Sequence, residues 1–304
     1  MNTWDAEFTV DISAARKVCA AECGLAPSRI ERLGEGWDNV VYLVNKKIVF
    51  RFPRRRAGVE CMLAELDLLP LVKTSLRVPR FIYSSRQSRI TGRPFAGYEL
   101  IAGKPAWELA VTAREKDALV RPVARFLREL HSTRLPAGLR KKWDQREGWR
   151  TDVPGRLALA EKMFKKCEAL GVDFGFGFQK TGALLARARF PEAGALVHGD
   201  LYALHLILDA SHKPAGVIDW GDVHYGNPCV DLSIAFGYFQ RELFPAFEAE
   251  YGGIPDEWKL ASAFRTFCHG LSLLAYAADQ RKHALEKRTL ASILAGKAWI
   301  EDLS

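Results

Sequence analysis

The spacing of apolar residues changes several times within the first hundred positions. Residues 12–23 carry apolar side chains at helical spacing, which predicts a short amphipathic helix. Apolar and other residues then alternate within 40–44 and 47–52, around an Asn-Lys-Lys turn, which predicts a hairpin entered through glycines. Residues 60–72 return to helical spacing, and 78–83 are predicted to be extended. After its first helix, this region is therefore predicted to be mostly sheet with one helix.

Beyond residue 103 the apolar residues recur mainly at helical spacing. The windows with this pattern are 114–131, 156–171, 178–189 and 260–296. We therefore predict an α+β chain of two lobes: a β-rich lobe of residues 1–101 and a helical lobe of residues 102–304. The connection between the two lobes contains Gly103 and Pro105, which interrupt regular secondary structure. Two such lobes leave a cleft, where small-molecule sites usually lie.

Composition narrows the classes of partner. The chain has 304 residues, 48% of them hydrophobic, and a net charge of +8, but its Lys and Arg residues are dispersed apart from Arg51 and Arg54 to Arg56. A nucleotide's phosphates would satisfy that cluster, so we expect no nucleic-acid partner. Charged residues interrupt the first thirty positions, and no uncharged run approaches the length of a membrane span. The six cysteines form no CxxC pair. We expect a cytoplasmic protein with reduced cysteines and no membrane partner.

Two aspartates at the ends of apolar stretches indicate the chemistry of the protein. Asp200 follows Leu-Val-His-Gly, and Asp219 follows Gly-Val-Ile, nineteen residues later. In phosphoryl transfer one carboxylate accepts the proton of an attacking hydroxyl or orients it, and another holds Mg²⁺ against the phosphates. Asp200 suits the first role and Asp219 the second. His205 occupies the position five residues after the catalytic Asp, where kinases carry a second metal ligand.

The order His-Gly-Asp-Leu and then Ile-Asp-Trp-Gly-Asp resembles the signature of the aminoglycoside phosphotransferase family. The resemblance extends from Gly34 to about Gly253 and implies a bilobal protein-kinase-like fold, Mg²⁺ as cofactor and ATP or GTP as phosphate donor. The family usually carries Asn at the position of His205. A histidine there resembles the branches that phosphorylate the 2″-hydroxyl of aminoglycosides and the 2′-hydroxyl of macrolides. Asp219 and His205 would then hold the metal, and Asp200 would be the catalytic residue.

The same resemblance assigns nucleotide-binding residues in the first lobe. Arg51 stands where kinases carry the lysine that contacts the phosphates, and Glu65 matches its helix partner, with Glu60 as the competing candidate. Gly34 and Gly36 resemble the nucleotide-positioning loop, where a missing side chain lets the backbone approach phosphate. In the connector, Glu99 and Ile101 would bind the purine through main-chain atoms.

Three further polar residues are interpreted as scaffold. His198 is expected to hold the catalytic loop rather than to transfer a proton. His131 ends a helix that resembles one in the family, and Asp231 resembles an aspartate that caps the backbone of the catalytic loop. None of the three is expected to be catalytic.

The acceptor is expected to be a small molecule with a hydroxyl group, of the aminoglycoside type, bound to a monomer or weak dimer. The alternatives are a macrolide, a metabolite such as choline, homoserine or a sugar, and a non-catalytic nucleotide-binding homologue. Carboxylates that could bind a polycation are Glu242, Glu248, Glu250, Asp256 and Glu257. Aromatic residues that could line a macrolide pocket are Phe236, Tyr238, Phe239, Phe244, Phe247 and Tyr276.

Overall fold

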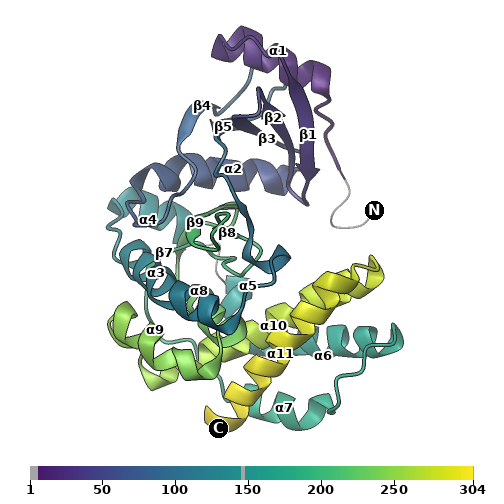
Figure 1. Cartoon of the computed structure of the whole chain (residues 1–304), viewed down its shortest axis with the longest axis vertical. Helices are drawn as coiled ribbons and strands as arrows, with labels where there is room; N and C mark the ends of the chain where they lie inside the picture. The colour runs from purple at the N-terminus through teal and green to yellow at the C-terminus, as the bar shows by residue number, and fades with distance from the viewer. Residues whose placement is uncertain (1–5, 145–147, 304) are drawn as a thin grey trace.

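The N-terminal part of the computed structural model is an antiparallel sheet covered by a helix on one face (Figure 1). The structure describes residues 6–144 and 148–303. The sheet order is β1-β2-β3-β5-β4. Its elements are α1 (Ile12–Cys23), β1 (Ile30–Glu35), β2 (Asn39–Val44), β3 (Ile48–Pro53), α2 (Arg56–Leu68), β4 (Phe81–Ser85) and β5 (Phe95–Glu99). The predicted glycine-bearing entry to the hairpin is thus a strand of its own, β1.

A tight turn fixes the register that places Arg51. Asn45 and Lys46 adopt φ of 52° and 56°, and Lys47 N donates to Val44 O at 3.0 Å. These values are typical of a two-residue hairpin turn. Side chains alternate across a strand, so β3 sends Phe50 and Phe52 into the core beneath α1 and Arg51 to the opposite face. That face meets α2.

The C-terminal part is mainly helical and contains the larger hydrophobic core. Its helices are α3 (Ala113–His131), α4 (Ala137–Trp143), α5 (Gly148–Thr151), α6 (Val153–Ala169), α7 (Phe178–Leu185), α8 (Cys229–Gly237), α9 (Phe244–Tyr251), α10 (Asp256–Asp279) and α11 (His283–Leu303). Helices α10 and α11 cross in front of the core in Figure 1. Short 3₁₀ turns lie at Leu69–Leu71, Ala106–Glu108 and Arg241–Leu243. Residues of α2 also join the larger core, so this helix packs between the two parts.

Short strands in this part carry the loops of the site. They are β6 (Lys104–Pro105), β7 (Ala195–Val197), β8 (Leu206–Leu208), β9 (Pro214–Val217) and β10 (His224–Gly226). Strand β7 pairs with β10, and β8 pairs with both β6 and β9, all antiparallel. Strands β7 and β9 belong to separate sheets, and each ends just before one of the two aspartates singled out in the sequence.

The predicted helices are present, with shifted ends. Helix α2 begins at Arg56, four residues before the predicted start, and the predicted window 260–296 is two helices separated near Arg281, which has a φ of 52°. None of the six cysteines, all of which lie within the described residues, forms a disulfide, and five are buried. Among the helices that the structure describes, none combines the length and hydrophobicity needed to cross a bilayer.

Candidate active site

The loop after β7 is held in place by one buried carboxylate. Asp231, in the first turn of α8, accepts hydrogen bonds from His198 N at 2.7 Å and Gly199 N at 2.9 Å. Gly199 adopts a φ of 84°, and a Cβ there would collide with the carbonyl oxygen of Asp222. Only glycine fits this position without strain. Asp231 also contacts His131 at 3.2 Å, so the buried carboxylate joins the end of α3 to the loop.

His198 has the geometry of a scaffold residue. Its Nε2 donates to the carbonyl oxygen of Ile218 at 3.0 Å, and its Nδ1 accepts from Asp200 N at 3.3 Å. The side chain is fully buried, and burial lowers the pKa of this imidazole below its ordinary value. A neutral ring with both nitrogens engaged ties the catalytic loop to the chain that precedes Asp219.

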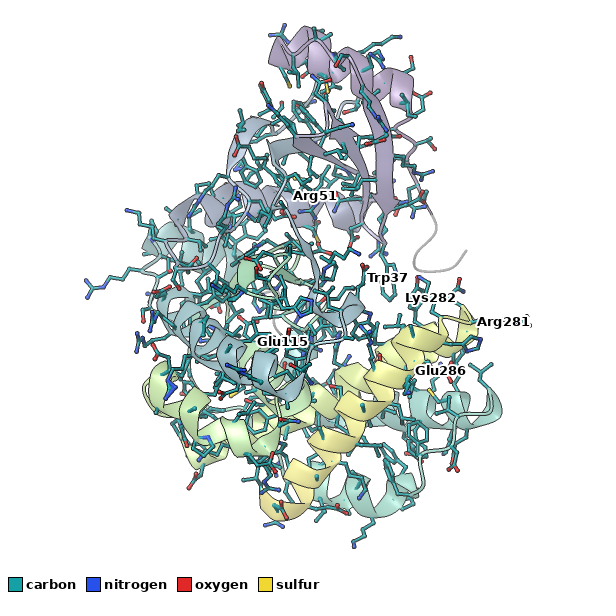
Figure 2. All side chains as sticks on the ribbon, viewed as in Figure 1. Trp37, Arg51, Glu115, Arg281, Lys282 and Glu286 are labelled. Carbon is teal, nitrogen blue, oxygen red and sulfur yellow. The ribbon has the colours of Figure 1, made fainter. Side chains whose placement is uncertain are left out.

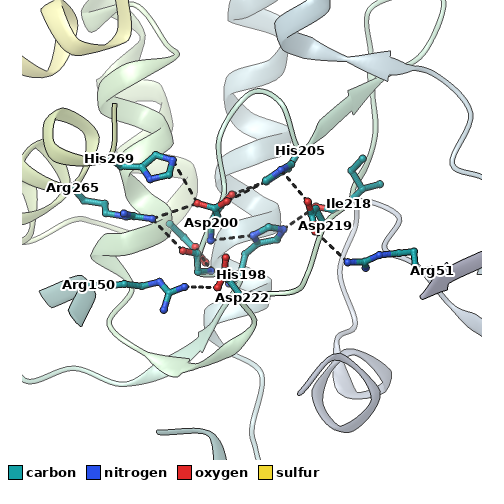
Figure 3. Close-up of polar contacts among 12 residues, drawn as sticks. Arg51, Arg150, His198, Asp200, His205, Ile218, Asp219, Asp222, Arg265 and His269 are labelled. Carbon is teal, nitrogen blue, oxygen red and sulfur yellow. Dashed lines mark hydrogen bonds and ion pairs between the residues drawn. The ribbon is translucent and has the colours of Figure 1, made fainter. Parts of the chain in front are cut away.

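The carboxylate of Asp200 lies beside two basic side chains of α10. Its Oδ1 is 3.4 Å from Arg265 Nη2 and 3.5 Å from His269 Nε2 (Figure 3). Burial raises the pKa of Asp200 to about 6, and the charge of Asp222 adds to the rise, while His205 and Arg265 oppose it. A carboxyl group with a pKa just below neutrality is ionised at pH 7 and basic enough to accept a proton.

His205 and Asp219 form a pair that could hold a metal ion. His205 Nδ1 lies 2.8 Å from the carbonyl oxygen of Asp200 and can donate to it, which leaves Nε2, 3.4 Å from Asp219 Oδ2, as the ring nitrogen that could bind a metal. No cluster of three or more metal-ligating side chains occurs among the described residues. Mg²⁺ commonly takes one or two protein ligands and completes its shell with water and phosphate oxygens, so a two-residue site suits it.

The backbone of Asp219 is held in an unusual conformation. Its φ of 62° lies in the left-handed region, which costs a non-glycine residue about 1–2 kcal/mol. Burial works to raise the pKa of this carboxyl, but His205 and Arg51 outweigh it and the pKa is lowered. Asp219 is therefore anionic, and 53% of its side chain is exposed.

Arg51 connects the sheet to this loop. Its Nη1 lies 2.6 Å from Glu65 Oε2, and its Nη2 lies 3.3 Å from Asp219 Oδ1. Burial alone would lower the pKa of the guanidinium, but Glu65, Tyr98 and Asp219 raise it above its ordinary value. Arg51 therefore pairs with Glu65, the partner favoured from the sequence, whereas the competing candidate Glu60 is exposed on α2. Five predicted site residues form one polar chain, in the order Glu65, Arg51, Asp219, His205 and Asp200.

The predicted glycine loop lies across the cleft from the helical part. Gly34 is in β1, and Gly36 N donates to Asn39 O at 2.9 Å in the turn that leads to β2. The ring of Trp37, at the tip, meets that of Tyr276 on α10, with centroids 5.8 Å apart (Figure 2). The loop tip therefore touches the helical part beside the cleft.

Glu99 is the last residue of β5, and Ile101 lies in the connector that follows it. Glu99 is exposed and Ile101 is buried against Gly216. Leu100 N, between them, donates to Lys47 O at 2.7 Å, which anchors the connector to the start of β3. Their predicted contact with a purine stays a prediction.

A pocket of about 540 Å³ opens beside Asp200 on the helical side. Its walls come from α3, α8, α10 and α11 together with the catalytic loop. Apolar residues in the lining include Trp107, Leu109, Val111, Ile234, Phe239 and Leu273. This volume is typical of a small-molecule site. Asp200 thus lies between the pocket and the polar chain that leads to Asp219.

The sequence matches the model of a known protein family. The model of the phosphotransferase enzyme family, APH, matches residues 29–264, which is more than half of the chain. The chain belongs to this family. A family member with these two lobes is a phosphotransferase, and both the predicted α+β kinase-like fold and the predicted enzyme class are confirmed.

This phosphotransferase is also similar to individual proteins. It is 27% identical over 193 residues to the uncharacterized protein YcbJ of Bacillus subtilis, and the match spans 60% of each chain. It resembles the structure of the GDP and kanamycin complex of APH(2″)-IIIa with 21% identity and a TM-score of 0.62, over 95% of this chain and 99% of the other. For apo macrolide 2′-phosphotransferase MphH from Brachybacterium faecium the identity is 22%, the TM-score 0.55 and the coverages 93% and 97%. These solved structures share its fold.

Three basic residues of the phosphotransferase site did not emerge from the sequence. Arg265 and His269 reach Asp200 from α10, and Arg150 pairs with Asp222 from α5. The sequence does carry a signal for the first two: they lie one helical turn apart within residues 260–275, a mainly apolar stretch with no other charged residue. Polar residues on such a stretch indicate a function or a buried partner. The helix carrying Arg150 is too short for periodicity to reveal.

Proposed function

We propose that this phosphotransferase transfers the γ-phosphoryl group of Mg²⁺-bound ATP or GTP to a hydroxyl group of a small molecule bound beside Asp200. The observation that carries the proposal is the position of Asp200. Its carboxylate borders the 540 Å³ pocket, while His205 and the polar chain connect it to Asp219 and Arg51. A hydroxyl in the pocket and a phosphate at Asp219 would thus meet at one point.

Each residue of the chain then has a role in the transfer. Asp200 orients the acceptor hydroxyl and accepts its proton as the new oxygen–phosphorus bond forms and the bond from the γ-phosphorus to the bridging oxygen breaks, which releases the nucleoside diphosphate. Arg51, fixed by Glu65, donates to phosphate oxygens. Asp219 and His205 would hold Mg²⁺, which neutralises phosphate charge when bound. Gly34, Gly36, Glu99 and Ile101 would contact the nucleotide through the backbone.

The aminoglycoside-type acceptor expected from the sequence requires a pocket rich in carboxylates. The described lining contains one carboxylate, that of Asp200. Among the proposed acidic residues, Glu248 and Asp256 pair with Lys259, and Glu250 pairs with Arg125. The apolar walls suit the bulky macrolide type better, with Tyr238 and Phe239 in the lining. A polycation is therefore not the favoured acceptor, although aminoglycosides are included in the experiment described next.

Product formation tests the proposal. The protein is incubated with ATP or GTP, Mg²⁺ and a panel of aminoglycosides, macrolides and small alcohols, and acceptor phosphorylation is followed by mass spectrometry. We expect phosphorylation of at least one acceptor that depends on both Mg²⁺ and nucleotide. Nucleotide binding without transfer to any acceptor or to water would instead support the non-catalytic homologue. Asp219→Ala should weaken Mg²⁺-nucleotide affinity in a titration, and unchanged affinity would contradict its role.

A further inference from the structure

The charges around the acceptor pocket are unbalanced. Among the described residues that line it, Asp200 is the single acid. The basic lining residues are Lys116, Arg241, Arg265, His269 and Arg288. A mostly apolar pocket with a surplus of cations repels a polycation and attracts an anion.

Two of these cations are already neutralised by carboxylates of the protein. Arg265 lies beside Asp200. Arg241 pairs with Asp302 of α11 and stacks over the ring of Trp299 at 4.4 Å. Burial lowers the pKa of His269 well below its ordinary value, so this imidazole is neutral at pH 7. The unbalanced charge therefore resides on Lys116 and Arg288.

Lys116 of α3 and Arg288 of α11 both line the pocket, close enough for their charges to interact. Lys116 Nζ donates to Tyr238 O at 3.0 Å and lies 4.8 Å from the centre of the Tyr238 ring. Burial first, and then the charge of Arg288, lower the pKa of Lys116. Two neighbouring cations in a partly buried wall destabilise each other unless an anion joins them.

Two acidic neighbours along the two helices have other partners, and Asp117, the residue after Lys116, is exposed. Glu115 Oε1 lies 2.8 Å from His212 Nδ1, and Glu286 Oε2 lies 3.6 Å from His283 Nδ1. Figure 2 labels both glutamates, one residue from Lys116 and two from Arg288. Within the described part of the chain, neither cation has a carboxylate at ion-pair distance.

Two hydroxyl groups of the same pocket lack a protein partner. Tyr238 and Thr289 both line it, and the oxygen of each side chain is buried with no hydrogen bond within the described residues. Burial raises the pKa of Tyr238 to about 12, so its phenol keeps the proton and can donate it in a hydrogen bond. A buried hydroxyl without a hydrogen-bond partner is unfavourable, and a ligand oxygen that accepts from it would remove this penalty.

We propose that the acceptor is an apolar hydroxyl compound that carries an anionic group, held by Lys116 and Arg288 beside the Tyr238 hydroxyl. The inference rests on the proposed phosphotransfer and specifies its acceptor class. The apolar body of the compound packs in the pocket, its hydroxyl meets Asp200, and its anion joins the two cations. A carboxylate fits this arrangement because it accepts several charge-assisted hydrogen bonds at once.

A set of three probes that differ only in charge tests the inference. An ω-hydroxy fatty acid, its methyl ester and the corresponding amino alcohol share a hydroxyl and an apolar chain. Binding of each is measured by calorimetry without nucleotide, and phosphorylation is measured with ATP and GTP. We expect the acid to bind at least about tenfold more tightly than the ester, and the amino alcohol more weakly than both.

A double variant and a matched control locate the effect. Lys116→Gln with Arg288→Gln should reduce the preference for acid over ester to within about twofold, while binding of the ester is retained. Arg114→Gln with Lys287→Gln removes the same charge from exposed positions of the same helices and should leave the preference unchanged. Retained ester binding also shows that the double variant is folded.

The two readouts separate this inference from the proposed function. Charge-selective binding that depends on Lys116 and Arg288 supports the anion site even if no probe is phosphorylated, and that result would count against the phosphotransfer proposal. Phosphorylation of the probes with no preference for the acid overturns the anion site and leaves phosphotransfer standing. Failure of the acid to bind, or an equal loss of preference in the control variant, also overturns the anion site.

Discussion

Replacement of Arg265 by glutamine should move the pH dependence of the reaction. The guanidinium lies 3.4 Å from Asp200 and opposes the rise in the pKa of this carboxyl that burial causes. His269 is neutral at pH 7 and does not replace that charge. Arg265→Gln should therefore raise the pKa of Asp200 further, above its value of about 6 in the wild type.

The magnitude follows from the effect of one adjacent charge. An arginine within hydrogen-bonding range lowers a carboxyl pKa by about 1–3 units. A rise of about 2 units would leave roughly one-tenth of the Asp200 carboxyls ionised at pH 7, compared with roughly nine-tenths in the wild type. The kcat/KM for the acceptor should then fall about tenfold at pH 7 and recover at about pH 9.

The assay is a pH profile of kcat/KM at saturating nucleotide for the wild type, Arg265→Gln and Arg265→Lys. The lysine variant retains the charge and should keep an inflection near that of the wild type. A thermal melt at each pH checks that the variants are folded. An unchanged inflection in Arg265→Gln, or a loss that is equal at every pH, would refute the role assigned to the Arg265 charge.

Three other substitutions have defined outcomes. Because folding raises the pKa of Asp200, the folded state binds more protons than the unfolded state between about pH 4 and 6 and loses stability as pH rises through that window. Asp200→Asn should therefore increase the free energy of unfolding by about 1–3 kcal/mol at pH 7, measured by urea unfolding. No gain would contradict the raised pKa. Glu65→Ala leaves the buried Arg51 guanidinium without its carboxylate and should cost about 3–5 kcal/mol, whereas a loss below about 1 kcal/mol would show that the pair is dispensable. Gly199→Ala should lower stability by about 2–4 kcal/mol in thermal unfolding, and a wild-type melt would exclude the collision with Asp222.

The local sequence pattern was sufficient to predict those parts of the site that depend on one strand or one loop. Alternation in β3 predicts that Arg51 and Phe50 face opposite sides, and the structure has Phe50 in the sheet core. The motifs around Asp200 and Asp219 lie at strand ends, as expected. The short sequence distance between Arg51 and Glu65 allowed their pairing to be predicted from a template of the fold.

Long-range packing set the features that the sequence did not show. The contact of Arg265 with Asp200 depends on how α10 crosses the loop. The proximity of the Lys116 and Arg288 charges depends on α3 and α11 meeting at one pocket. Three of the five acidic residues named as candidates for a polycation site, Glu248, Glu250 and Asp256, pair with basic residues of the protein. Composition reports how many charges are present, whereas tertiary packing decides which remain unpaired.

The central claim is that Asp200 acts on a hydroxyl at the edge of a nucleotide site. Its most direct test is transfer of labelled γ-phosphate from ATP or GTP to the acceptor by the wild type and by Asp200→Asn, with nucleotide affinity measured in parallel. We expect transfer to fall by at least about a hundredfold in the variant, with nucleotide affinity within about twofold of the wild type. Undiminished transfer in a variant that still binds nucleotide would contradict the account.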